Sequence, residues 1–508
     1  MDNKIKRYAL LALRSVEFPL FLYFFAITLF QSAQKSLITA KMCLYKFDNE
    51  AFCEKVANDD NDNEPALQHI KQVISDDFGR FLFVSQLCNN IPLVVMAIMH
   101  GSMCDRFSHK AGIISSHLGN AVLTAIYMIY SALPAKVMYP GHMAYSSLLV
   151  GFSGSWAVIS LVSFAYACRT TNPTSRTIRL ATMQASATGG QIFGYFLNFL
   201  GFRNYIYPFD LIFTIQIAIH LFAIVHVILH VPELHTKEEV QDRLEKQANG
   251  NWLKFVWVPK ENFPAVFKIF FGKHSDGRPI QATRFIRVLF ISYLFTSMIL
   301  GFKSLGTVIE QFLRMPPISM TDEVFSLFQG TYSIVATVGL LTIPIFKAIN
   351  FSDAGIAEVG LVIKMLSLVI LGFGDVFPRG AHWIYALMSI FAMYPLVAIR
   401  AGMSKLAADN KQGRLFAVLV QAENFMSVIA RNCFEQLFDV LTKSKPVALA
   451  AYINGYTFFF AAGMLLLPIV MIGFVARRYF PNWSFHQTII EHDFAYARLR
   501  AHSSINFA

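Results

Sequence analysis

The feature that most constrains this chain is a series of long apolar runs. A helix needs about 20 consecutive apolar residues to cross a hydrocarbon core of roughly 30 Å. Twelve such runs can be read in the sequence, at 17–39, 79–100, 111–133, 141–167, 180–200, 209–230, 287–312, 324–346, 354–375, 382–404, 415–440 and 448–476. They predict an all-α membrane protein with twelve transmembrane helices.

The composition excludes the main alternatives to a membrane protein. Charged residues are 15% of the 508 residues and hydrophobic residues are 55%, whereas a soluble protein carries about 25% charged residues. So few charges cannot cover the surface of a soluble protein, which excludes a soluble multidomain enzyme. The 49 Phe and 19 Tyr residues exclude a disordered chain, because disordered segments are poor in aromatic residues.

The runs form two sets of six on either side of the longest charged segment. We predict an N-terminal six-helix bundle at 1–230, a cytosolic connecting loop at 231–286, a C-terminal six-helix bundle at 287–476 and a cytosolic tail at 477–508. Placing both termini in the cytosol puts about 27 of the 43 Lys and Arg residues on the cytosolic side, as the positive-inside rule requires. The net charge of +11 therefore reflects topology, and we expect a lipid bilayer but no nucleic acid as partner.

Two of the six cysteines, Cys43 and Cys53, lie in the predicted first outer loop. The outer side of a cell membrane permits disulfides, but the sequence leaves a disulfide and two free thiols open as alternatives.

Polar residues recur at helical spacing within several of the apolar runs. Lipid-facing positions are apolar, so these polar faces point into the protein. Single polar residues can simply hold helices together, whereas polar faces on five or more helices favour a shared hydrated cavity. We predict that substrate contacts come from Gln184 and Gln191 in the fifth run and from Trp156 and Ser160 in the fourth.

Charged residues at membrane depth are a sharper signal, because each costs a few kcal/mol unless it is compensated. Lys303, Lys364 and Arg400 lie in the second set of runs. Cations exceed acids there, so we predict that these three residues bind an anionic substrate. The alternative for Lys303 is that its side chain extends to the outer interface.

Three residues are candidates for proton coupling: Glu423, His220 and Glu310. Glu423 can instead be a permanent ion-pair partner of one of the lysines or of Arg400. A histidine in an apolar helix is more often a hydrogen-bonded core residue, which is the alternative for His220.

The turn between the second and third runs reads Gly101-Ser-Met-Cys-Asp-Arg-Phe-Ser-His-Lys110. This segment resembles the signature of major facilitator transporters. The resemblance implies a gate in which Asp105 pairs with basic groups and with a helix N-terminus, next to Arg106 and Lys110, and so holds the cytosolic side closed.

Further segments narrow the family. Tyr394-Pro-Leu-Val-Ala-Ile-Arg-Ala-Gly-Met-Ser-Lys-Leu406 is followed by Gln412-Gly-Arg-Leu-Phe416. With Pro232-Glu233 after the sixth run, these segments resemble the proton-coupled folate transporter family, solute carrier family 46. The resemblance implies the major facilitator fold, with two six-helix bundles, and a role in substrate handling for Arg400. The family's proton-coupling glutamate falls on Gln184, which does not titrate, and its histidine in the seventh span falls on Ile299.

We therefore expect a secondary active transporter that uses alternating access to move an organic anion together with a proton. Folates, muropeptides and cyclic dinucleotides are the substrate classes that the family implies. The alternatives are a transport-inactive sensor or scaffold and a uniporter without proton coupling. No nucleophile or metal-binding motif is evident in the sequence, so we expect neither an enzyme nor a cofactor.

The membrane that holds the protein is the least constrained property. Tyr8-Ala-Leu-Leu11 and Tyr496-Ala-Arg-Leu499 fit an endocytic signal of the Tyr-x-x-apolar kind. Such tetrapeptides are frequent by chance, so we expect the plasma membrane ahead of endolysosomal membranes.

Overall fold

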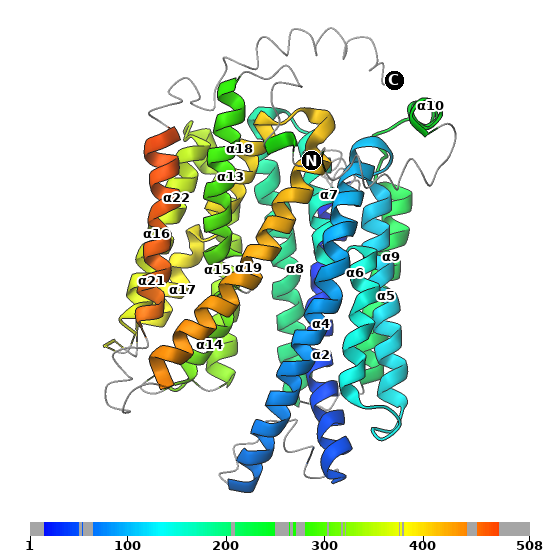
Figure 1. The fold of residues 1–508 in the computed structure, drawn as a ribbon, viewed down its shortest axis with the longest axis vertical. Coiled ribbons are helices and arrows are strands. Elements are labelled where there is room, and N and C mark those ends of the chain that lie inside the picture. Colours follow the sequence, from blue (N-terminus) through cyan, green and yellow to red (C-terminus); the bar gives the residue numbers. More distant parts are fainter. Residues whose placement is uncertain are drawn as a thin grey trace, which may run out of the picture. The chain divides into compact units, whose positions relative to one another are not determined.

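A computed structural model (Figure 1) describes residues 15–49, 53, 65–204, 209–248, 264, 268–270, 280–301, 304–315, 318–320, 322–374, 376–377, 380–443 and 455–476. Within these ranges the regular structure is helical. The chain divides into two compact units. The first consists of Met1–Ile269, Gln329–Val338 and Ala407–Ala422, and the second of Phe270–Phe328, Gly339–Leu406 and Glu423–Ala508.

The helices of the first unit follow each other along the N-terminal half of the chain. They are α2 (Glu17–Phe47), α4 (Pro65–Arg106), α5 (Lys110–Ala132), η1 (Pro140–Ser146), α6 (Ser147–Ser153), α7 (Ser155–Arg169), η2 (Pro173–Ser175), α8 (Arg176–Asn204), α9 (Phe209–His230) and α10 (Lys237–Ala248). Figure 1 shows α2, α4, α5 and α9 of this unit running in roughly the same direction. The most extensive packing joins α2 to α8 and α5 to α9.

The C-terminal half contains shorter and more interrupted helices. They are α13 (Ile280–Leu300), α14 (Gly306–Arg314), α15 (Asp322–Ala348), α16 (Asp353–Gly372), α17 (Ala381–Met388), η3 (Ser389–Phe391), α18 (Tyr394–Leu406), η4 (Asp409–Lys411), α19 (Gln412–Lys443), α21 (Tyr456–Met464), α22 (Leu466–Val470) and the π-helix η5 (Met471–Ala476). The middle of α15 and the first turns of α19 belong to the first unit.

Nine helices or helical series in the described part of the chain are long and apolar enough to cross a membrane. Three more of the predicted runs, 17–39, 180–200 and 415–440, lie on the long helices α2, α8 and α19, which do not meet this hydropathy criterion. All three carry polar residues inside their apolar sequence. The all-α membrane fold is confirmed, and the count of twelve spans stays a prediction.

The prediction of one continuous helix at 287–312 is wrong. Helix α13 ends at Leu300, and α14 begins at Gly306. The hydroxyl of Ser304 donates to the carbonyl oxygens of Ser297 at 3.2 Å and Gly301 at 3.1 Å. A serine that bonds to nearby carbonyls in this way competes with the helical pattern, and here it closes the turn.

The predicted outer end of the first unit is packed and cross-linked. Helices α2 and α4 have 31 and 42 residues, about 46 Å and 63 Å at 1.5 Å per residue, and therefore extend beyond a hydrocarbon core. Cys43 at the end of α2 forms a disulfide with Cys53. Both cysteines are buried in an apolar cluster with Ile74, Phe81 and Tyr127, so the disulfide is the alternative that the structure shows.

Candidate functional site

Arg400 lies at the centre of a buried polar group in the second unit. Its Nη2 forms an ion pair with Glu423 Oε2, and its Nε donates to the Tyr293 hydroxyl at 3.0 Å. The Tyr293 hydroxyl donates in turn to Glu423 Oε2 at 2.9 Å. The residues come from α18, α13 and α19, and all three are buried. Glu423 thus pairs with Arg400 in this structure, and its role in proton coupling stays a prediction.

The geometry of this group follows from its chemistry. A charge taken out of water is tolerated when an opposite charge and further hydrogen bonds compensate it. Glu423 balances the charge of Arg400, and the phenol of Tyr293 supplies one hydrogen bond to each of them. The predicted surplus of positive charge therefore does not come from Arg400 in this state.

Lys364 lies elsewhere in the second unit, on α16. Its Nζ donates to the hydroxyl of Tyr385 at 2.7 Å and lies 4.4 Å from the centroid of that ring, close enough for a cation–π interaction. The ring of Tyr385 stacks on Phe328, and Phe328 also contacts His382 and Trp383. Lys364 is buried, so this cation lies beside an aromatic cluster rather than at the lipid surface.

The other two charged candidates of this half differ from Lys364. Glu310 pairs with Arg314 one turn further along α14, at 3.0 Å, and both side chains are more than a third exposed. An exposed ion pair of this kind is worth little energetically, and the role of Glu310 in proton coupling stays a prediction. Lys303 lies outside the described residues.

The predicted substrate contacts of the first unit lie on two helices that pack against each other, α7 and α8. Gln184 and Gln191 on α8 are partly exposed, as is Trp156 on α7, whereas Ser160 is buried. Whether they touch a substrate stays a prediction.

His220 lies in the middle of α9 and contacts a second histidine. Its Nδ1 lies 3.0 Å from Nδ1 of His117 on α5, and both rings are buried. His117 could not be singled out from the sequence, because a histidine seven residues after the gate motif carries no periodic signal. Only the packing of α5 on α9 reveals the pair.

Asp105 is the last residue but one of α4 and accepts two hydrogen bonds from the first turn of α19, within the first unit. The backbone N–H of Gly413 donates at 2.7 Å and that of Arg414 at 3.0 Å, and Arg414 Nε lies 3.9 Å away. A carboxylate at a helix N-terminus satisfies free N–H groups and interacts favourably with the helix dipole. The two helices approach closely, since a Cβ at Gly101 would lie 2.7 Å from the carbonyl oxygen of Gly413.

The segment that carries Arg106 and Lys110 is held by two hydrogen bonds within the first unit. Lys110 Nζ donates to the carbonyl oxygen of Ile228 at 3.1 Å, near the end of α9, and the Arg106 carbonyl accepts from Arg243 on α10 at 3.0 Å. Arg414 supplies the cation of the ion pair recorded for Asp105. Whether Asp105, Arg106 and Lys110 act as a gate stays a prediction.

Three further ion pairs near the predicted cytosolic side were not expected from the sequence. In the first unit the buried Arg176 pairs with Asp409. In the second unit the buried Asp353 pairs with Lys347 at 2.9 Å and with Lys405. Asp353 was detectable as an acid in the first turn of α16 after the basic end of α15, whereas Asp409 gave no signal.

Glu233, which follows α9, binds the turn that follows Asp105. It accepts from the Ser108 hydroxyl at 2.6 Å and from the His109 backbone N–H at 3.0 Å. Burial raises the pKa of Glu233, but the hydrogen bonds from His109 and Ser108 outweigh it and bring the pKa down to about 2. Burial and the positive charge of Arg169 lower the pKa of nearby His235 to about 4. At neutral pH the groups beside this turn are therefore an anionic Glu233 and a neutral His235.

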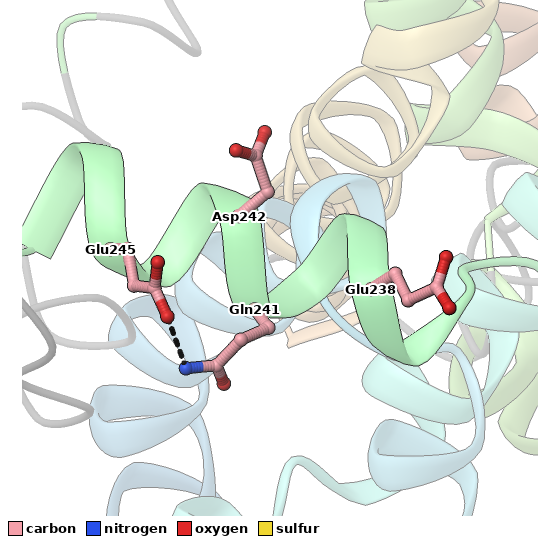
Figure 2. A pocket seen from close by; sticks show the side chains of 4 residues that line it. All are labelled: Glu238, Gln241, Asp242 and Glu245. Atoms are coloured by element: carbon pink, nitrogen blue, oxygen red, sulfur yellow. Dashed lines mark hydrogen bonds between the residues drawn. The ribbon is translucent and has the colours of Figure 1, made fainter.

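An open hollow of about 540 Å³ lies along α10 in the first unit. Figure 2 shows Glu238, Gln241, Asp242 and Glu245 along this helix, with Gln241 donating to Glu245 at 2.8 Å. Three carboxylates repel an organic anion, so this hollow does not suit the predicted substrate.

Comparisons with known proteins agree with this architecture. No family model matches the chain. The lysosomal proton-coupled steroid conjugate and bile acid symporter SLC46A3 of Gallus gallus is 21% identical over 89% of this chain and 92% of its own length. The proton-coupled folate transporter of Bos taurus is 20% identical over 74% of each chain. The resemblance to solute carrier family 46 is confirmed.

Solved structures show the same fold. The human organic anion transporter MFSD10 superimposes with a TM-score of 0.63 at 12% identity, covering 91% of this chain and 99% of that one. The Escherichia coli fucose:proton symporter FucP superimposes with a TM-score of 0.56 at 14% identity, again covering 91% and 99%. The chain has the major facilitator fold, and its relatives are transporters rather than enzymes.

Proposed function

We propose that this member of the major facilitator fold is a secondary active transporter that moves a small organic anion across a membrane together with a proton. The observation that carries the proposal is the buried group of Arg400, Glu423 and Tyr293. A guanidinium that already binds one carboxylate has the geometry to bind another, because its fork of N–H donors matches a carboxylate or sulfate. The names of the relatives are consistent with this class, since they include folate, steroid-conjugate and bile-acid symporters.

The same group couples the anion to a proton. While Glu423 is ionised, it occupies Arg400. A proton on Glu423 removes its charge and releases the guanidinium for the substrate anion. This effect is reciprocal. The factor by which a proton on Glu423 raises the affinity for the anion is also the factor by which a bound anion raises the affinity of Glu423 for the proton. Tyr293 keeps the guanidinium in position in both states, because its hydroxyl bonds to Arg400 Nε.

Lys364 adds to the preference for anions that carry an apolar ring. Its ammonium group lies against Tyr385, in a cluster that also contains Phe328. An anion with a flat apolar body would contact these rings while its charge faces the lysine.

On the cytosolic side, the hydrogen bonds of Asp105 to the first turn of α19 form the gate contact. Alternating access requires contacts that form on one side of the membrane and break in the other state. Two charge-assisted hydrogen bonds, and an ion pair between the buried Arg176 and the exposed Asp409, are suited to this, since water can replace them when the segments separate.

We propose an endolysosomal membrane as the location, because the SLC46A3 relatives are named lysosomal. The plasma membrane favoured by the sequence is the alternative. Both Tyr-x-x-apolar segments lie outside the described residues, so imaging of a tagged full-length chain, with Tyr496→Ala as the variant, is the test.

Reconstituted vesicles test the transport function directly. The purified chain would be offered radiolabelled folate, taurocholate and estrone sulfate with and without an inward proton gradient. Saturable accumulation that depends on the gradient is expected for at least one of these probes. Equal uptake with and without the gradient would show a uniporter, and binding without accumulation would show a sensor or scaffold; either result overturns the proposal.

A further inference from the structure

The first unit contains two buried histidines that the proposed Arg400–Glu423 mechanism does not use. Nδ1 of His117 and Nδ1 of His220 are 3.0 Å apart, which is a hydrogen-bond distance. The two rings are inclined at 64° with their centroids 5.3 Å apart. Such a contact requires a proton on one of the two nitrogens and a lone pair on the other, so the two tautomers are linked.

Two imidazoles in this arrangement bind an added proton as one unit. Two added protons would make both rings cationic, and two N–H groups would then face each other in a buried site. One added proton instead gives an imidazolium that donates to a neutral imidazole, which is a charge-assisted hydrogen bond. Sites coupled this strongly titrate together.

The surroundings of the pair are polar but uncharged. The ring of Tyr23 on α2 meets His117 at 5.4 Å and His220 at 6.0 Å between centroids. The Tyr23 hydroxyl accepts from Asn120 on α5 at 2.9 Å and is also hydrogen-bonded to Ser155 on α7. Tyr23 is thus the titratable group that faces the pair from α2. Among the described residues, no recorded ion pair or hydrogen bond joins a carboxylate, lysine or arginine to either ring.

Gln216 provides a second, independent sign of a small polar ligand. It is fully buried on the same face of α9, one turn before His220. Neither its amide oxygen nor its amide nitrogen has a hydrogen-bond partner among the described residues. Buried amides are almost always hydrogen-bonded to protein or to ordered water, so this position suits water that also solvates a proton on the pair.

We propose that His117 and His220 form one proton-binding site in the first unit, solvated from Gln216. The proposal rests on the proposed transport function, because the bound proton acts in the same cycle as the proton on Glu423.

The first experiment measures proton binding without any substrate. The full-length chain, labelled with ¹⁵N-histidine and held in lipid nanodiscs, would be titrated by NMR from about pH 4.5 to about pH 8, the range in which imidazoles change charge. We expect His117 and His220 to titrate with one shared midpoint, and His117→Gln to move the midpoint of His220. Separate midpoints, or neutral rings throughout the range, would overturn the proposal.

The second experiment connects the site to transport. In vesicles with an imposed pH gradient, His117→Gln/His220→Gln should shift the pH of half-maximal uptake by about one unit, which is a tenfold change in proton affinity. His100→Gln is the matched control, because His100 is also buried in the first unit but has Met96 and Ser115 as partners of its two ring nitrogens. An unshifted profile for the double variant, or an equal shift for the control, would contradict the coupling role.

The two experiments separate the two proposals. If the wild-type chain accumulates none of the probes but the pair titrates as one unit, the transport function fails and the proton site stands. If transport depends on the proton gradient while the histidines titrate separately, the transport function stands and the site is wrong.

Discussion

The two units solve the problem of buried polarity in different ways. In the second unit full charges are buried in pairs, as Arg400 with Glu423, and a cation lies against a phenol, as Lys364 with Tyr385. In the first unit the groups buried at the middle of α5 and α9 are histidines and amides. An arginine keeps its charge at any pH, whereas a carboxylate and a histidine respond to acid. We propose that the second unit binds the anion, with Glu423 as its acid-sensitive group, and that the histidines of the first unit are a second acid-sensitive site.

The largest expected effect comes from the charge in the second unit. Arg400→Ala should reduce uptake of an anionic probe about 100-fold, because the bound anion loses its charge partner, and such a loss in binding costs about 2–5 kcal/mol. Surface abundance and initial uptake would be measured together.

Arg400→Ala also leaves Glu423 without its partner, so folding needs its own control. Arg400→Gln/Glu423→Gln removes both charges while keeping polar side chains, and it should restore abundance without restoring uptake. Full uptake by the double variant would show that the ion pair is only structural and would break the contrast between the units.

The next effect concerns the gate. Asp105→Ala should lower the transport rate about tenfold, because it leaves the N–H groups of Gly413 and Arg414 without their acceptor, and charge-assisted hydrogen bonds contribute about 1.5–3 kcal/mol. Asp105→Asn, which keeps one acceptor oxygen, should lie between Ala and wild type. Stopped-flow uptake measures the ranking, and equal rates for all three would remove the gate role.

Glu423→Gln tests how much of the pH dependence of uptake comes from the second unit. Glutamine keeps a hydrogen bond to Arg400 but cannot titrate, so the dependence of uptake on pH should flatten several-fold while some uptake persists. The residual dependence would then come from the first unit. If the pH profile keeps its full slope, the coupled proton binds at another site.

The smallest effect is on stability, at Glu233. Its pKa of about 2 lies below the ordinary value of 4.5, so ionised Glu233 stabilises the folded state above pH 4.5 and loses this contribution as the pH falls toward 2. Glu233→Gln should therefore lower the thermal midpoint at pH 7 by a few degrees, with the difference from wild type narrowing below pH 4.5. A constant difference across this range would mean that the charge of Glu233 does not contribute.

Much of the fold was readable because a bilayer imposes simple rules. Apolar runs of spanning length predicted helices at each position that the structure describes. The exceptions were breaks inside runs, as at Ser304, where a local hydrogen bond ended α13. The sequence also singled out Asp105, Arg400 and Lys364 as candidate site residues, because charged residues in or beside apolar runs are conspicuous.

Which buried groups meet was not readable. Arg400 and Glu423 are 23 residues apart and His117 and His220 are 103 apart, and nothing in the spacing of residues records such pairs. The sequence by itself determined that this protein is a bundle of membrane helices with charges that need compensation, because the cost of transferring residues into lipid depends on residue type alone. Only the tertiary structure decided that Glu423 compensates Arg400 and that the histidines share one contact, because compensation depends on distances that helix packing sets.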